Sequence, residues 1–212
     1  MGRFAIWGAS GHGSVAFDAA ALSGEHEIVG FLDDDPSLKG QVLAGSPVLG
    51  GREVLQSLRA SGVSAIHVAV GDCEIRLRIA TTLQSDGFAL QTVVHPRSIV
   101  ASSAVVGSGT LVAAGAIIGP GARVGRSVIL NTASSVDHDC VLGDAVHLAP
   151  GVRLGGLVNV GEATFVGIGA IVLNCLRIGE RCVIGGGAVV VKDLPAGVLA
   201  YGVPARVVRE RR

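Results

Sequence analysis

Residues 111–130 read LVAAGAIIGPGARVGRSVIL, and in this stretch a medium-sized aliphatic residue returns at every sixth position. The same phase continues in both directions without a slip. The positions of the series are Val94, Val100, Val106, Val112, Ile118, Val124, Leu130, Val136, Leu142, Leu148, Leu154, Val160, Val166, Val172, Ile178, Ile184 and Val190. An α-helix repeats every 3.6 residues and a strand every 2, so neither gives a strict period of six. A coil with three flat faces of six residues does, and the series predicts a solenoid with each aliphatic side chain pointing to its axis.

Two other kinds of residue keep the same phase. A glycine often follows the aliphatic residue directly, as at Gly107 and Gly119, and we expect it to permit the turn backbone. The residue four after the aliphatic is small or β-branched almost throughout, as at Ala116, and is expected to fill the corner of the coil. Cys140 and Cys182 occupy this small position, so they are expected to be reduced core residues.

Residues 1–90 lack the repeat and alternate short apolar runs with helical patterns. The expected strands are 3–7, 27–32, 65–70 and 90–94, and the expected helices follow residue 13 and cover 52–61 and 75–85. Strands that alternate with helices imply a parallel sheet with right-handed crossovers, as in Rossmann-like domains. The chain is therefore expected to divide into an α/β domain at 1–93, a parallel β-helix at 94–192 and a closing segment at 193–212.

Composition excludes several classes of protein. The formal net charge is zero and no basic stripe is present, which argues against a nucleic-acid partner. No stretch of about twenty residues is apolar without glycine or charge, so no membrane span is expected. The four cysteines form no CxxC pair, and no charged-then-apolar signal sequence opens the chain, so a cytoplasmic protein is expected.

A glycine-rich turn, Gly8-Ala9-Ser10-Gly11-His12-Gly13, follows the first expected strand. Its spacing is GxxGxG, whereas dinucleotide sites usually have GxGxxG. A glycine turn that opens a helix offers bare N–H groups to phosphate. Asp33 lies about twenty residues later, at the end of the next strand, where it could take a ribose hydroxyl or a base. The turn thus indicates either a nucleotide ligand or a purely structural bend. A nicotinamide dehydrogenase is the obvious rival, but a separate substrate domain is lacking.

His138 is the histidine with the clearest chemical setting. It lies two residues past the inward Val136, so it should project from an outer face, and both of its neighbours are acids. An imidazole beside a carboxylate is a plausible general base, although a surface histidine without function is the alternative. His147 lies nine residues on, half of an eighteen-residue coil, and should face another side of the prism. The two could converge only between neighbouring chains, which predicts a site at a subunit interface.

The hexad array and its ending, 191–206, resemble the left-handed β-helix (hexapeptide-repeat) acyltransferases. The segments 8–13, 31–34, 71–76 and 131–140 resemble one bacterial subfamily of these enzymes more closely. That subfamily contains the sugar-nucleotide 4-amino N-acetyltransferases and the sialic acid O-acetyltransferases. The resemblance implies a homotrimer that uses acetyl-CoA as co-substrate, needs no metal and acetylates the 4-amino group of a nucleotide-linked sugar of the UDP-4-amino-4,6-dideoxy type. O-acetylation of sialic acid or a related sugar is the alternative. A metal hydratase of the γ-carbonic anhydrase kind is more distant, because it would need three histidines on zinc.

The resemblance also implies roles for single residues. His138 would be the catalytic base and Asp139, in a position where the family often has Glu, would raise its basicity. His147 would lie near the acetyl-CoA thioester, with Asn131 in the same pocket. Three residues would border the pantetheine channel, namely Gly156, Ile168 and Gly186. Six would contact the nucleotide sugar, namely Ser10, Gly11, His12, Asp33, Asp34 and Gly71.

Overall fold

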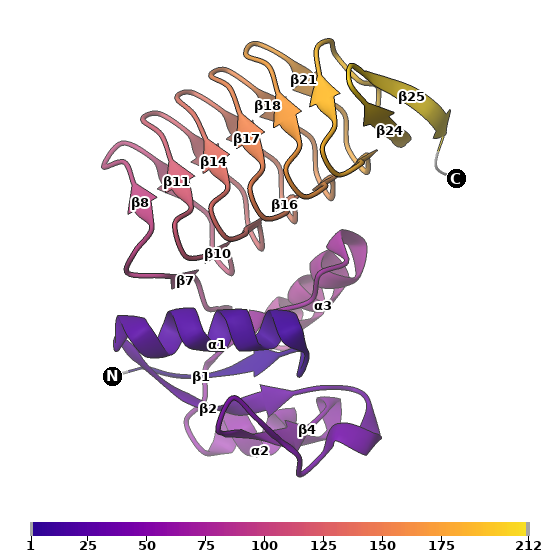
Figure 1. Cartoon of the computed structure of the whole chain (residues 1–212). Coiled ribbons are helices and arrows are strands. Elements are labelled where there is room, and N and C mark those ends of the chain that lie inside the picture. Colours follow the sequence, from indigo (N-terminus) through magenta and orange to yellow (C-terminus); the bar gives the residue numbers. More distant parts are fainter. Residues whose placement is uncertain (1, 211–212) are drawn as a thin grey trace.

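The structure, a computed structural model, describes residues 2–210, and Figure 1 shows a β-helix seated on a smaller α/β domain. Residues 1 and 211–212, and with them the last part of the expected closing segment, lie outside the described residues. The chain is a Rossmann-like α/β domain followed by a left-handed parallel β-helix, as predicted.

The α/β domain contains one six-stranded sheet in the order β3-β4-β2-β1-β5-β6. Its elements are β1 (Gly2–Trp7), α1 (Gly11–Ser23), β2 (His26–Leu32), the 3-10 turn η1 (Pro36–Leu38), β3 (Val42–Leu43), β4 (Ser46–Gly50), η2 (Arg52–Val54), α2 (Leu55–Ala60), β5 (Ala65–Val68), α3 (Cys73–Ser85) and β6 (Ala89–Leu90). All pairings are parallel except that of β3 with β4. The β3–β4 hairpin was not predicted, and the helix expected at 52–61 begins as a 3-10 turn.

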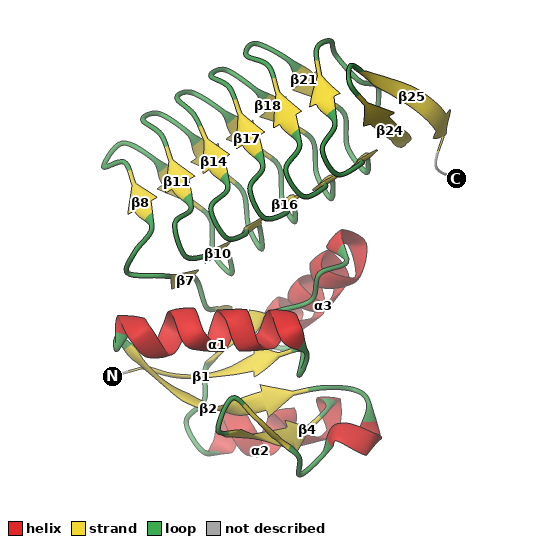
Figure 2. Cartoon of the chain, viewed as in Figure 1, coloured by secondary structure: helices red, strands yellow, loops and turns green. Residues whose placement is uncertain are grey.

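The β-helix has three faces, each a parallel sheet of two-residue strands (Figure 2). The first face contains β7 (Val93–Val94), β10 (Leu111–Val112), β13 (Ile129–Leu130), β16 (His147–Leu148), β19 (Phe165–Val166) and β22 (Val183–Ile184). The second contains β8 (Ile99–Val100), β11 (Ile117–Ile118), β14 (Ser135–Val136), β17 (Arg153–Leu154), β20 (Ile171–Val172) and β23 (Val189–Val190). The third contains β9 (Val105–Val106), β12 (Arg123–Val124), β15 (Val141–Leu142), β18 (Asn159–Val160) and β21 (Arg177–Ile178). The first face is closed by β24 (Val198–Gly202), which pairs with β25 (Ala205–Glu210).

The aliphatic series points inward as predicted from Val112 to Val190, where no member is more than 4% exposed. In the first coil, Val94 and Val100 keep the register of the inward Val112 and Ile118, so they too face the axis. Val94 and Val100 are 38% and 39% exposed, because no further coil covers the open end of the prism. Cys140 and Cys182 are buried and free, as expected.

The glycines that follow the aliphatic residues have a different role from the expected one. The left-handed backbone occurs two residues later, for example at Ser127, Ala145 and Ala163, whose φ values are 52°, 55° and 53°. At Gly143 a Cβ atom would stand 2.6 Å from the backbone nitrogen of Glu162 in the next coil. These glycines therefore allow successive coils to stack closely, whereas the turn itself is made at the corner residue.

The two domains share a core. Helix α1 packs its buried alanines on the outer side of the first face, against Val93, Leu111 and Ile129, and Figure 1 shows it between the sheet and the β-helix. The strand expected at 90–94 is in fact two, because β6 ends the α/β sheet and β7 begins the first face. The sheet domain is thereby fixed beside the first three strands of this face, next to β16, which carries His147.

Candidate functional site

His138 lies at the corner between β14 and the third face, with half of its side chain exposed. Its Nδ1 stands 2.9 Å from Oδ2 of Asp139, and because a carboxylate can only accept, Nδ1 carries the proton and Nε2 is left as the basic nitrogen. The hydrogen bond to Asp139 raises the pKa of His138 above its ordinary value, and the charge of Asp137 adds to the shift. The aspartate reaches the ring although it is one methylene shorter than glutamate, because it projects from a left-handed corner over the bare Cα of Gly121.

Gly156 lies one coil further along, directly against the imidazole. A Cβ atom built on Gly156 would collide with Nε2 of His138. Within residues 2–210 the backbone N–H of Gly156 has no hydrogen-bond acceptor. The corner thus combines a basic nitrogen with a free N–H group beside it. Acyl transfer requires this pair, since a base must accept a proton while a donor stabilises the oxyanion.

Ile168 and Gly186 lie at the other edge of the second face. Ile168 is 63% exposed, and a Cβ atom on Gly186 would contact its Cγ2 atom at 3.1 Å. Within one chain they are therefore separated from His138 and Gly156 by the width of that face. Their role in binding pantetheine stays a prediction.

His147 is buried on the first face and belongs to a different group of residues. Its Nδ1 donates to the carbonyl oxygen of Gly71 at 3.0 Å, and its Nε2 lies 3.4 Å from the Asn131 side-chain nitrogen. The ring centroids of His12 and Phe165 lie 5.8 and 5.0 Å from that of His147. The structure thus brings together His147 and Asn131, expected beside acetyl-CoA, with His12 and Gly71, expected beside the nucleotide sugar.

Both imidazoles of this group are neutral at physiological pH. Burial lowers the pKa of His12 to about 3, with further lowering by His147, His67 and Arg76. Burial also lowers the pKa of His147 to about 4, against the opposing hydrogen bond to Gly71. Because Nδ1 of His147 holds the single proton, its Nε2 can only accept a hydrogen bond. This group can bind and orient a polar ligand without adding charge.

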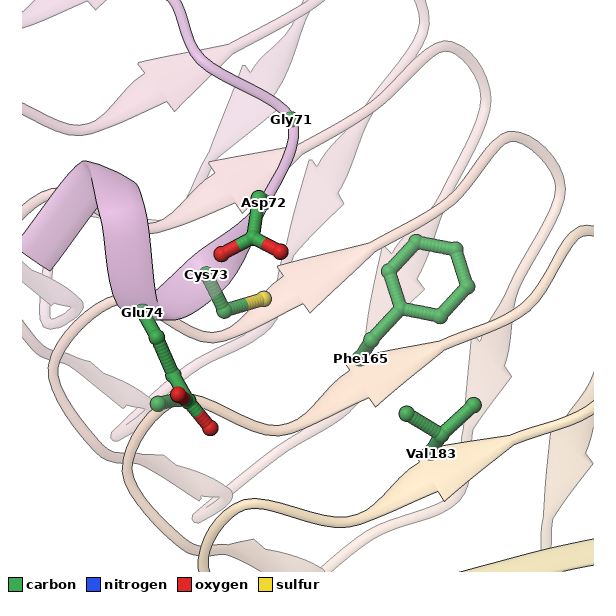
Figure 3. A pocket seen from close by; sticks show the side chains of 7 residues that line it. Gly71, Asp72, Cys73, Glu74, Phe165 and Val183 are labelled. Atoms are coloured by element: carbon green, nitrogen blue, oxygen red, sulfur yellow. The ribbon is translucent and has the colours of Figure 1, made fainter.

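A pocket of about 340 Å³ opens beside this group, between the start of α3 and the first face. Figure 3 shows Asp72, Cys73 and Glu74 on one side and Phe165 and Val183 projecting from the β-helix strands on the other. Neither Phe165 nor Asp72 was predicted as a site residue from the sequence. Phe165 is the only Phe, Tyr or Trp between residues 94 and 192, and this departure from the aliphatic pattern was the available signal.

The glycine turn lies at the carboxyl end of β1, beside the ends of β2 and β5. Gly8 has a φ of 114°, and a Cβ atom on Gly13 would collide with the Gly8 carbonyl oxygen, so both glycines are required by the turn itself. A Cβ atom on Gly11 would meet nothing within 4 Å. Ser10 precedes α1 without a side-chain capping bond. Gly11 and Ser10 are therefore the members of the turn that packing leaves open to a ligand.

The two predicted aspartates are already engaged in the protein. The Asp33 carboxylate accepts from the backbone nitrogens of Ala9 and Asp35, at 2.9 and 3.0 Å, and so joins the glycine turn to the end of β2. Asp34 forms an exposed ion pair with Arg52 at 3.4 Å. The glycine turn, both aspartates and Gly71 lie along one edge of the sheet, as the strand order predicts.

Comparison with known proteins decides the family. Residues 3–83 match the PglD N-terminal domain family. The chain is 33% identical to a GDP-perosamine N-acetyltransferase of Escherichia coli O157:H7. The aligned region of 188 residues covers 84% of this chain and 81% of the relative. The chain belongs to the hexapeptide-repeat sugar N-acetyltransferases.

Two solved structures of this family are similar over nearly the whole chain. PerB from Caulobacter crescentus, in complex with CoA and GDP-perosamine, is 39% identical, with a TM-score of 0.93 and coverage of 99% of this chain and 98% of that one. The acetyltransferase domain of PglB from Neisseria gonorrhoeae, in complex with acetyl coenzyme A, is 40% identical, with a TM-score of 0.91 and coverage of 97% and 98%. The protein is an acyltransferase, as predicted.

Two properties of residues 2–210 bear on the other classes considered. None of the helices is both long and apolar enough to cross a bilayer. No group of three or more His, Cys, Asp and Glu side chains within this range is placed to hold a metal ion. His138 and His147 lie on different sides of the prism, as their half-coil spacing predicts.

Proposed function

We propose that this acetyltransferase transfers the acetyl group of acetyl-CoA to the 4-amino group of a sugar linked to a nucleoside diphosphate. The observation that carries the proposal is the His138 corner, where Nε2 is free, Nδ1 is held by Asp139, and the Gly156 N–H is unused. The relatives support the same reaction, since one is a GDP-perosamine N-acetyltransferase and the PerB structure contains CoA and GDP-perosamine. The four cysteines, all within residues 2–210, form no disulfide there, which fits a reducing compartment, so the cytoplasm remains the expected location.

The proposed chemistry needs only groups of the chain and the two substrates. The amine nitrogen attacks the thioester carbonyl carbon, and Nε2 of His138 accepts the proton that the nitrogen loses. The oxyanion that forms accepts a hydrogen bond from the N–H of Gly156. The carbon–sulfur bond then breaks, the acetyl group stays on nitrogen, and the imidazolium returns the proton to the departing thiolate, whose parent thiol has a pKa near ~8.5.

The nucleotide is proposed to bind at the glycine turn. Ser10 and Gly11 would face its phosphates at the start of α1, with His12, Asp33, Asp34 and Gly71 around them. The sugar would extend into the pocket beside Gly71, where the Phe165 ring offers an apolar wall and His12 and His147 offer neutral polar groups.

The site is proposed to be completed in a homotrimer. In one chain, the base at the His138 corner and the pocket beside His147 lie on different sides of the β-helix. A neighbouring copy that supplies His138 to this pocket would join base and acceptor, with Asn131 and His147 near the thioester. Ile168 and Gly186 would line the groove for pantetheine between the two copies.

The deciding experiment is a thiol-release assay with acetyl-CoA and matched acceptors. The acceptors are 4-amino-4,6-dideoxy sugars linked to UDP, the type that the resemblance implies, or to GDP, the nucleotide of the relatives, each beside its 4-hydroxy counterpart. Release of CoA with a 4-amino acceptor only, and its loss in His138→Ala, is the expected result. Turnover of the hydroxy sugars or of a sialic acid instead would establish the O-acetyltransferase alternative, and no turnover of any acceptor would contradict the proposal.

A further inference from the structure

Arg76 is the largest fully buried side chain among residues 2–210, and its hydrogen bonds join the two domains. It projects from the first turns of α3, and its guanidinium donates to five backbone carbonyl oxygens. These are Ser127 at 2.8 Å, Val70 at 2.7 Å, Gly71 at 3.1 Å, Ala145 at 2.6 Å and Val146 at 3.4 Å. A buried charge is costly unless it is hydrogen-bonded in this way, so its placement requires a reason.

The β-helix leaves two of these carbonyls without another partner. Ser127 and Ala145 occupy left-handed corners of successive coils. Within residues 2–210 no backbone N–H donates to either carbonyl oxygen. The planar, multivalent guanidinium satisfies both, one coil apart, and lysine has no comparable fork of donors. Arg76 thereby fixes the start of α3 against two consecutive coils.

The other end of the guanidinium holds the loop that follows β5. The Gly71 carbonyl oxygen accepts both from Arg76 and from Nδ1 of His147. A carbonyl kept in this orientation decides which nitrogen of His147 carries the proton. It leaves Nε2 as an acceptor on the side of Asn131.

We propose that Arg76 is a positioning residue, which sets the spacing between the nucleotide loop and the β-helix and, through the Gly71 carbonyl, the tautomer of His147. The effect of Arg76 on turnover rests on the proposed function. Its effect on the tautomer of His147 is independent of that function, so the two claims can fail separately.

The test compares Arg76→Met and Arg76→Lys with Arg78→Met, a control at an exposed arginine two residues along the same helix. Side-chain nitrogen NMR on protein labelled at histidine, with His147 assigned from a His147→Asn variant, reports the tautomer directly. Wild type and Arg78→Met are expected to show a single neutral form protonated at Nδ1. Arg76→Met is expected to lose this single form, because the Gly71 carbonyl is no longer held.

Kinetics of the same variants test the consequence. Removing hydrogen bonds from a charged group should lower kcat/KM for the nucleotide amino sugar about ten- to a hundredfold, with a smaller loss in Arg76→Lys. The pH at which kcat/KM rises, which reports the pKa of His138, should be the same in all variants, since His138 lies on another side of the prism. A variant that is merely less stable would change neither the tautomer nor kcat/KM well below its unfolding temperature.

A folded Arg76→Met that keeps the Nδ1–H form and a kcat/KM within about twofold of wild type would overturn the proposal. If Arg76→Met does not fold, Arg76→Lys decides by the same two measurements. If neither folds, Arg76 acts on stability and the positioning role is rejected. A further outcome is that Arg76→Met changes the tautomer of His147 while the wild-type protein acetylates no nucleotide amino sugar. That result would uphold the role of Arg76 and reject the proposed function.

Discussion

At the scale of single residues, the proposed mechanism depends most on Nε2 of His138. General-base assistance typically contributes about 10²–10⁴-fold. His138→Ala is expected to lower kcat by this order while acetyl-CoA still binds, as checked by calorimetry on the variant. The ring is half exposed and makes its one side-chain bond to Asp139, so the fold should be unaffected. If more than about a tenth of wild-type kcat remains, the loss is smaller than the low end of that range. His138 is then not the base, and His147 becomes the next candidate.

Asp139 should tune this base without replacing it. The hydrogen bond to Asp139 raises the pKa of His138, and only the unprotonated imidazole can accept a proton. Activity should therefore rise with pH through that raised pKa. Asp139→Asn should lower the pKa of His138 and move the limb of kcat/KM to lower pH, at a smaller cost in rate than His138→Ala. An unmoved limb in a variant of normal stability would show that a different group titrates.

Gly156 gives the sharpest steric test of the corner. Its φ does not lie in the left-handed region, so alanine is tolerated by the backbone, but the new methyl group would displace the His138 imidazole. A displacement of about 1 Å can cost about a hundredfold in rate, and Gly156→Ala is expected to lower kcat by that order with little change in Tm. Wild-type kcat in this variant would show that the ring position seen here is not the reactive one.

At the scale of elements, Asp33 connects the end of β2 to the glycine turn before α1. Asp33→Ala removes the acceptor for the Ala9 nitrogen and should loosen this turn, so KM for the nucleotide sugar should rise about tenfold or more while KM for acetyl-CoA changes little. Asp34→Ala is the comparison, because it removes an exposed ion pair and a backbone hydrogen bond, both with Arg52, and leaves the bond to Ala9 in place; any rise in KM in this variant then reports contact with the nucleotide and not a loosened turn. An increase confined to KM for acetyl-CoA would reassign the α/β domain.

The elements best predicted from the sequence are those in which equivalent residues meet the same surroundings in the fold. The hexad series predicts the β-helix because its inward positions all meet the same narrow axis. It does not predict the exposure of Val94 and Val100, since their burial would require a further coil before the first one. The division of 90–94 into β6 and β7 was not predictable, because both short strands are apolar and only the tertiary structure assigns them to different sheets.

The site is predictable only in part, for the same reason. His138 was identified because its acidic neighbour is adjacent in sequence. The contacts of His147 with Gly71 and His12, and those of Arg76 with two corners, join residues far apart in the chain. No local pattern contains them. The resemblance supplied residue roles, but it did not indicate that Asn131 and His147 lie beside the nucleotide loop.

At the scale of the whole molecule, buried neutral histidines should make the protein sensitive to acid. Burial lowers the pKa of His67 to about 4, and that of His147 likewise to about 4. In the unfolded chain each titrates near ~6.5, so between these values the unfolded state binds more protons and stability is lost as pH falls. Each should contribute up to about 1.4 kcal/mol per pH unit to the free energy of unfolding. Urea unfolding between pH 7 and pH 4, at one protein concentration, should show a shallower slope in His67→Leu than in wild type, and an equal slope would contradict this origin.

The proposed assembly makes its own prediction, because base and acceptor pocket would come from different copies. Gly11→Trp should block binding of the nucleotide, and so keep the sugar out of the pocket, without disturbing the fold, since Gly11 has open space around it. His138→Ala should remove the base. Each variant alone is expected to be inactive. In trimers assembled from equal amounts of both, a site works when one copy supplies an intact base and its neighbour an intact pocket. With random mixing, about a quarter of all sites meet this condition, so about a quarter of wild-type activity should return. The measurement is CoA release after the mixture is refolded. A site built within one chain gives no recovery at all, and a fully active monomer in ultracentrifugation would exclude the shared site independently.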